Sequence, residues 1–264
     1  MWLKPASSSQ SFTSLGNLGI LVQRAVIICY FLLVAACLYF VEWHDMHWWS
    51  LLLTVYIALW CADFVSGLIH LYIDYRPLNF AKGFGVLYDF KGDRGGQQFI
   101  ELKKGIMQHA NWFDHTVYSF KIHHRDASSN KHKPYREFFI DFAAPASLFL
   151  LCSPAISLLF PGNALAAHLA LGVVILSVAA LHSDHIHVCL HGSSSMVLGS
   201  RIVQFLSRHR LIYSYKTHAL HHKDGLTGFC FVTGHANFAV NWICKKLLQY
   251  GILRSDDWFG LPRK

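Results

Sequence analysis

The chain has 264 residues, of which 53% are hydrophobic and only 14% are charged. Soluble domains carry about 25% charged residues, so this deficit predicts a membrane protein. The net charge of +8 suits either a nucleic acid or an anionic membrane surface as partner. Seven scattered cysteines without a CxxC pair exclude a disulfide framework and a zinc ribbon.

Four apolar runs predict an all-α fold built on about four transmembrane helices. Residues 1–19 form a polar, Ser-rich tail, and 20–264 form one membrane domain. Each run is close to the ~20 residues that a helix needs to cross a bilayer. The first run could also be a secretory signal, but it continues past the cleavage-like stretch that ends at Cys37. The expected spans are about 20–41, 48–69, 138–160 and 164–181.

The parts outside these spans, 70–137 and 182–264, are polar, basic and rich in histidine. With four spans, the N-terminus and both of these parts lie on one side of the membrane. All 23 Lys and Arg residues fall on that side, and the positive-inside rule makes it cytoplasmic. Topology and anionic lipid therefore account for the basic charge, and no nucleic-acid partner is expected.

The first histidine cluster closes the second span, in ADFVSGLIHLYID. His70 and Asp74 are four residues apart on one helix face, so both can reach one metal ion. Asp63 lies deeper in the apolar run, where an ionisable side chain is costly and needs a reason. It is predicted to orient His70 from outside the ligand shell. Taken alone, this cluster is also compatible with a helix-end histidine beside a solvated aspartate.

Three more clusters follow on the same predicted side. They are the pair His123–His124 with His132 nearby, the i, i+4 pair His187 and His191, and the group His218, His221 and His222. Any one cluster could be incidental, but together they offer about ten nitrogen and oxygen ligands, which suits two metal ions better than one. A His-rich dinuclear site in a membrane favours oxygen chemistry on lipid chains, because an unactivated C–H bond offers no acid–base route.

An ordered set of motifs resembles the Kua-type lipid desaturases, a family that includes plasmanylethanolamine desaturases and plant plastid phosphatidylglycerol trans-desaturases. The matching pieces are ADFVSGLIHLYID, KIHHRDASSNKH, HIHVCLH, HALHH and FCFVTGHANF, which cover most of 60–264 in order. The C-terminal RSDDW resembles the plasmanylethanolamine branch. The resemblance implies a cytosolic helical cap that holds two iron ions through His70, Asp74, His123, His124, His132, His187, His191, His218, His221 and His222.

The same resemblance implies O2 as co-substrate, a membrane phospholipid as substrate, and a separate electron donor such as cytochrome b5 with its reductase, or ferredoxin. The chain departs from the family pattern at two places, and both weaken the inference of its substrate from the family. The family has another histidine after HxxHH, where this chain reads KDGLTG and Asp224 could substitute, and the 77–118 link is longer than usual. His185 stands where the family has Gln, and it is left out of the predicted ligands.

The position of the ligands predicts where a lipid would be oxidised. His70 ends the second span and His187 follows the fourth, so a metal held there faces the headgroup end of a lipid chain. We therefore expect a double bond within the first few carbons, and the resemblance favours the vinyl ether of plasmalogens. The expected location is the endoplasmic reticulum in a eukaryote or the inner membrane in a bacterium.

Three alternatives remain open from the sequence. An acyl-lipid desaturase acting near the headgroup and a membrane di-iron hydroxylase would use the same ligands. A metal transporter is the alternative outside enzymes, but transporter ligands are expected in mid-span rather than at span ends.

Overall fold

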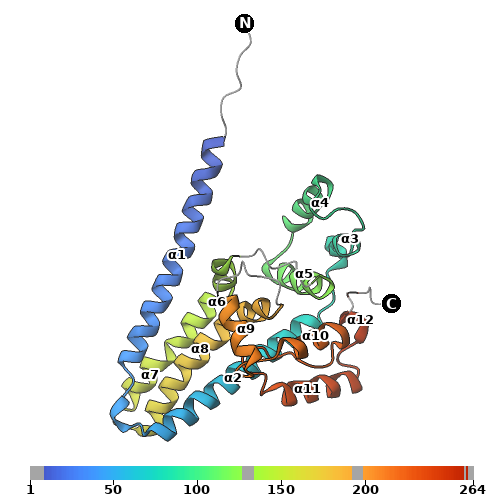
Figure 1. Ribbon diagram of the computed structural model, residues 1–264. Coiled ribbons are helices and arrows are strands. Elements are labelled where there is room, and N and C mark those ends of the chain that lie inside the picture. The colour runs from blue at the N-terminus through green and yellow to red at the C-terminus, as the bar shows by residue number, and fades with distance from the viewer. Residues whose placement is uncertain (1–8, 127–133, 192–198, 259, 261–264) are drawn as a thin grey trace. The chain divides into compact units, whose positions relative to one another are not determined.

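A computed structural model describes residues 9–126, 134–191, 199–258 and 260 (Figure 1). These residues form helices and contain no strand, which confirms the all-α prediction for the described part. Two short 3-10 turns, η1 (Trp43–Asp45) and η2 (Phe80–Lys82), join them. The helices are α1 (Ser9–Tyr39), α2 (Trp48–Asp74), α3 (Phe84–Asp89), α4 (Gln97–Met107), α5 (Trp112–Arg125), α6 (Tyr135–Leu150), α7 (Cys152–Leu159), α8 (Ala164–Leu190), α9 (Ser200–Arg208), α10 (Tyr215–Asp224), α11 (Asn237–Gln249) and α12 (Ser255–Trp258).

Four helical stretches are long and apolar enough to cross a membrane. They are Gly19–Tyr39 in α1, Trp48–Asp74, Tyr135–Leu159 across α6 and α7, and Ala164–Leu190. By length and composition these stretches make the chain a membrane protein. They correspond in order to the four apolar runs of the sequence.

The helices extend further than the apolar runs do. α1 begins at Ser9, inside the segment expected to be a polar tail. α2 continues to Asp74 and α8 to Leu190, past the expected span ends at 69 and 181. No Gly or Pro interrupts either extension, so a change in side-chain polarity does not end the helix.

The chain divides into two compact units. Residues 1–58 and 133–185 form the first unit, whose core joins α1, α6 and α8. There Tyr30 and Ser177 share a hydrogen bond of 3.0 Å between their hydroxyl oxygens, and Ser177 donates a second one to the Ala146 carbonyl at 2.9 Å. These bonds satisfy hydroxyl groups that would otherwise be buried without partners.

Residues 59–132 and 186–264 form the second unit, which contains all the clustered histidines apart from His182 and His185. Within it, Leu71 near the end of α2 and Tyr75 just after it pack against Phe229, Val240 and Trp258. Figure 1 shows α10, α11 and α12 gathered beside this end of α2. Smaller helices α3, α4 and α5 form a second core.

One glycine allows α2 to approach the 229–236 segment closely. A Cβ atom on Gly67 would lie 2.4 Å from the Cys230 sulfur, which no real contact permits. A side chain here would therefore push α2 away from the segment that orients the site described below.

Candidate metal centre

Nine histidine and aspartate side chains of the second unit converge in two groups. The first, here the five-histidine group, contains His123, His187, His191, His218 and His222. The second, here the Asp74 group, contains His70, Asp74, His124 and His221. Within each group the potential ligand atoms all lie within 4.8 Å of one another. Each group could hold a metal ion.

The Asp74 group surrounds a buried carboxylate with imidazole nitrogens. Asp74 Oδ2 lies 2.9 Å from His70 Nε2 and 3.4 Å from His221 Nε2. Asp74 Oδ1 lies 3.6 Å from His124 Nε2. All four side chains are 7% exposed or less, yet these atoms form no hydrogen bond of normal geometry. Buried polar atoms without partners are rare and require an explanation.

The five-histidine group brings Nε2 atoms face to face. His123 and His187 approach to 3.0 Å, His191 and His218 to 2.9 Å, and His218 and His222 to 3.1 Å. A neutral imidazole has one N–H and one lone pair, so the Nε2 atom of His218 cannot satisfy two such neighbours with one proton. Hydrogen bonding alone does not account for this arrangement.

A metal ion shared within each group would account for both arrangements. Two ligands that bind one ion at about 2.1 Å lie about 3.0 Å apart at a right angle and about 3.4 Å apart at a tetrahedral angle. The separations in the two groups, from 2.9 to 3.6 Å, match these edges of a coordination shell. The donor set therefore fits two ions bound through imidazole nitrogen and one carboxylate.

Backbone carbonyls select the tautomer of two ligands. His70 Nδ1 lies 3.1 Å from the Phe229 carbonyl oxygen, and His221 Nδ1 lies 2.7 Å from that of Thr227. Each carbonyl accepts a hydrogen bond from the Nδ1–H group, which leaves the Nε2 lone pair directed at Asp74 and the space beside it. Such outer contacts are the usual means of orienting a metal-binding imidazole.

The local electrostatics keep the imidazoles neutral. Burial holds the pKa of His123, His124 and His218 well below its ordinary value. Burial also lowers the pKa of His191 to about 4 and that of His222 to about 3, and neighbouring histidines add to the effect. Neutral imidazole is the form that binds a metal.

Aromatic rings enclose both groups. The ring of Phe231 stacks on His187 with 4.1 Å between centroids and also lies 4.5 Å from the ring of His70. Trp258 lies 4.3 Å from the ring of His124. This lining removes water from one side of the ligands, which strengthens their electrostatic interactions with a cation.

Lys121 joins the end of α2 to the C-terminal helix α12. Its buried ammonium donates hydrogen bonds to the backbone carbonyls of Asp74, Asp257 and Trp258. Burial lowers the pKa of Lys121 to about 8, and Asp74 and Asp257 oppose this shift. The contact fixes the last residue of α2, which is a member of the Asp74 group.

Asp63 holds the backbone segment 232–236 in place. Its effect on His70 is indirect, because this segment follows the Phe229 carbonyl that faces His70. Its carboxylate accepts hydrogen bonds from the backbone amides of Val232, Thr233 and Ala236 at 2.9, 3.2 and 3.2 Å. The Thr233 hydroxyl donates a further bond at 3.0 Å. The Phe229 carbonyl that faces His70 precedes this segment by three residues. Asp63 therefore acts on His70 through the segment.

The structure brings together nine of the ten residues that the sequence predicts as ligands. His132, the tenth, lies outside the described residues. Asp224 is in neither group; its carboxylate accepts bonds from Leu226 N and Thr227 Oγ1 in a turn after α10. His182 contacts Tyr135 at 2.7 Å in the first unit, and the ring of His185 also lies beside Tyr135.

No role for Lys121, Phe231 or Trp258 follows from the sequence alone. All three lie in stretches that carry the family resemblance: KIHHRD, FCFVTG and RSDDW. Their position in these motifs could have marked them as candidates, but only the three-dimensional contacts show what each side chain does. The carbonyls of Thr227 and Phe229 had no sequence signal, because any residue supplies a carbonyl.

Comparison with protein-family models, curated proteins and solved structures finds no match to this chain. The fold and the site define the class: a membrane protein, helical throughout its described part, with two histidine-rich groups that could hold metal ions.

Proposed function

We propose that this chain is a membrane di-iron lipid desaturase that introduces a double bond close to the headgroup of a phospholipid. The observation that carries the proposal is the pair of buried ligand groups in one compact unit. The ends of two helices long enough to span a membrane supply some of their ligands. The family resemblance of the motifs supports the same class.

The ligand chemistry favours iron over other resident ions. Eight imidazoles and one carboxylate offer no thiolate, which disfavours a structural zinc or copper(I) site, and nitrogen and oxygen donors suit Fe(II). Two iron ions, when bound by these residues, would supply with O2 the oxidising power needed to break unactivated C–H bonds. The overall reaction takes two hydrogens from the lipid and two electrons and two protons from a carrier system, and reduces one O2 to two waters.

The chain's own residues provide alignment and exclusion of water. Phe231 and Trp258 cover the ligands, while the carbonyls of Phe229 and Thr227 fix two imidazoles. The oxidation needs no acid or base from the protein at the reacting carbons. These features support a role of preorganisation.

The location of the ligands on the helices supports attack near the headgroup. Asp74 is the last residue of the span-length helix α2, and Leu190, which precedes His191, is the last residue of α8. Ligands at span ends lie at the membrane boundary, where the first carbons of a lipid chain are found. We therefore propose C1–C2 of an alkyl ether chain, with a vinyl ether as product.

Metal analysis of the purified protein tests the centre. The expected result is close to two irons per chain. A single stoichiometric zinc would contradict the di-iron proposal.

Lipid analysis tests the reaction. The protein would be expressed in cells that lack plasmalogens, and their lipids measured by mass spectrometry before and after mild acid. We expect new acid-labile species with the wild type and none with His221→Ala. A hydroxylated lipid would instead indicate a hydroxylase, and a mid-chain double bond would refute the argument from depth.

A further inference from the structure

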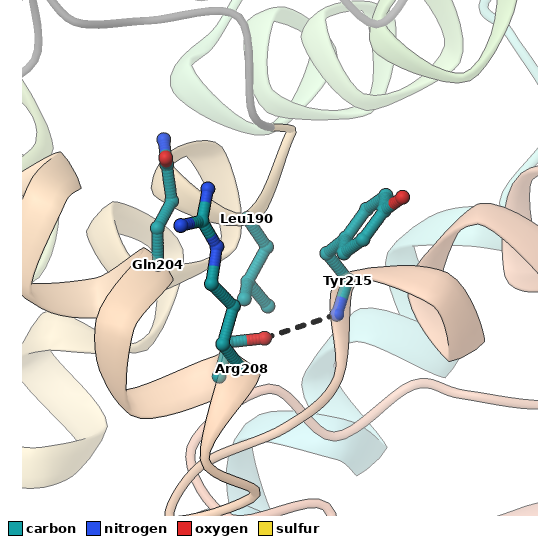
Figure 2. Close-up of a pocket in the computed structure, with 5 residues that line it drawn as sticks. Leu190, Gln204, Arg208 and Tyr215 are labelled. Carbon is teal, nitrogen blue, oxygen red and sulfur yellow. Dashed lines mark hydrogen bonds between the residues drawn. The ribbon is translucent and has the colours of Figure 1, made fainter.

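A cavity of about 430 Å³ lies beside the five-histidine group, lined by Leu190, Gln204, Ser207, Arg208 and Tyr215 (Figure 2). Its volume falls in the usual range of small-molecule sites, about 300–1,000 Å³. We propose that it binds the phosphate of a phospholipid headgroup through Arg208. The proposal rests on the proposed function, because it places the substrate of that reaction.

The proposal places the cavity at the level of a membrane boundary. Leu190, one of its lining residues, ends the span-length helix α8. Helix α9, which supplies three others, exposes Ile202 and Phe205 one turn apart while it also carries Arg201 and Arg208. Exposed apolar side chains combined with arginine are typical of a helix that lies in the headgroup layer.

The sequence segment that supplies the cavity lining carries only positive charge. From residue 185 to residue 223 the sequence contains no Asp or Glu, but it contains Arg201, Arg208, Arg210, Lys216 and Lys223. Among the residues that the structure describes, no carboxylate forms an ion pair with Arg208. Its guanidinium is therefore available to an external anion.

The other polar side chains complete a phosphate site. Figure 2 shows Gln204 and Arg208 on α9, with Tyr215 on the opposite wall. The Ser207 hydroxyl oxygen accepts a hydrogen bond from the Tyr215 amide at 3.2 Å, so its own proton remains to be donated. A guanidinium with neutral amide and hydroxyl donors recognises phosphate, and arginine can bind two of its oxygens at once.

Two sequence connections link the cavity to the metal ligands. Leu190 immediately precedes His191, and Tyr215 precedes His218 by three residues, which is about 4.5 Å along a helix axis. A phosphate in the cavity would therefore place the first carbons of its lipid chain next to the five-histidine group. This placement selects a phospholipid over a free anion as the natural ligand.

Native mass spectrometry of the purified full-length protein in detergent tests the site. Phosphatidylethanolamine and diacylglycerol with the same chains would be titrated onto the wild type and onto the variants Arg208→Gln, Arg208→Lys and Arg201→Gln. Arg201 is the matched control, because it lies on the same helix, has the same charge and does not line the cavity.

We expect Arg208→Gln to weaken phosphatidylethanolamine binding about tenfold, towards the level of diacylglycerol, because it removes a charge-assisted contact. Arg208→Lys should retain part of the affinity, and Arg201→Gln all of it. Competition by inorganic phosphate but no preference for phosphatidylethanolamine over diacylglycerol would assign the cavity to free phosphate and overturn the headgroup proposal. Unchanged phosphatidylethanolamine binding in Arg208→Gln would overturn it as well.

Iron content and product formation, measured on the same samples, separate this inference from the proposed function. If the wild type binds phospholipid through Arg208 but forms no double bond in any lipid, the site stands and the function fails. If Arg208→Gln retains its iron and forms product with an unchanged KM, the function stands and the headgroup site fails. If Arg208→Gln loses its iron, the comparison rests on Arg208→Lys, which preserves the charge and should retain part of the phospholipid affinity.

Discussion

The substitution Asp63→Asn tests how the site is held from outside its ligand shell. Asp63 is fully buried and accepts four hydrogen bonds from the 232–236 segment. Asparagine retains an oxygen for the amides of Val232 and Thr233, but it places an NH2 group where Oδ2 accepts from Ala236 N and the Thr233 hydroxyl. The amide of Ala236 then faces another donor.

The expected loss follows from counting these bonds. Two charge-assisted hydrogen bonds disappear, each contributing at least about 1.5 kcal/mol, so the free energy of unfolding should fall by about 3 kcal/mol. For a chain of this size this corresponds to a melting temperature lower by roughly 6–12 °C. The matched variant Thr233→Val loses the hydroxyl's bond to Asp63 and also the bond that the His235 amide donates to the hydroxyl oxygen. Because His235 is exposed, water can satisfy its amide, so about half of that decrease is expected.

The variant should also affect metal binding at one group more than at the other. The 232–236 segment follows the Phe229 carbonyl that orients His70, so the Asp74 group should lose affinity about 10–100-fold while the five-histidine group changes less. Thermal unfolding in detergent and metal titration measure the two effects. If Asp63→Asn melts with the wild type and binds metal as tightly, Asp63 does not support the site.

Three further outcomes are expected. His221→Ala and His123→Ala should each retain one ion in place of two, as measured by metal analysis, while His168→Ala, whose ring contacts Thr54 outside both groups, should retain two. Removal of the metal by a chelator should lower the melting temperature, because binding to the folded state alone stabilises it; an unchanged temperature would count against buried ion binding. With the chain expressed in the inner membrane of a bacterium, a membrane-impermeant thiol reagent applied to intact cells should label a cysteine placed at Asn163 but not one at Lys91, and the reverse would contradict the predicted cytoplasmic side.

Much of the fold was predictable because its signal is local. Four apolar runs predict four long helices, and the structure has four helical stretches of that kind. The helix ends were less predictable, because hydropathy detects where a helix leaves an apolar environment and not where its backbone stops. α8 thus continues through His182, His185 and His187 to Leu190.

The sequence allowed the residues of the candidate site to be predicted, but not how they divide between the two groups. Residue type and i, i+4 spacing were enough to select the histidines that converge. No spacing rule indicates that the adjacent residues His123 and His124 enter different groups, or that His221 separates from His218 and His222. That division depends on the tertiary packing of α5 and α10 against α2, which brings residues far apart in sequence together.

This partition has a consequence for how the two groups work together. Successive residues on a helix point about 100° apart, so one helix can supply ligands to two neighbouring sites. α5 does so through His123 and His124, and α10 through His221 and His222. Two independent mononuclear sites would not require shared helices. Because α5 and α10 each supply ligands to both groups, backbone geometry sets the distance between the groups. That distance cannot change without moving ligands of both groups. A reaction that requires two ions at once needs a protein that fixes their separation in this way.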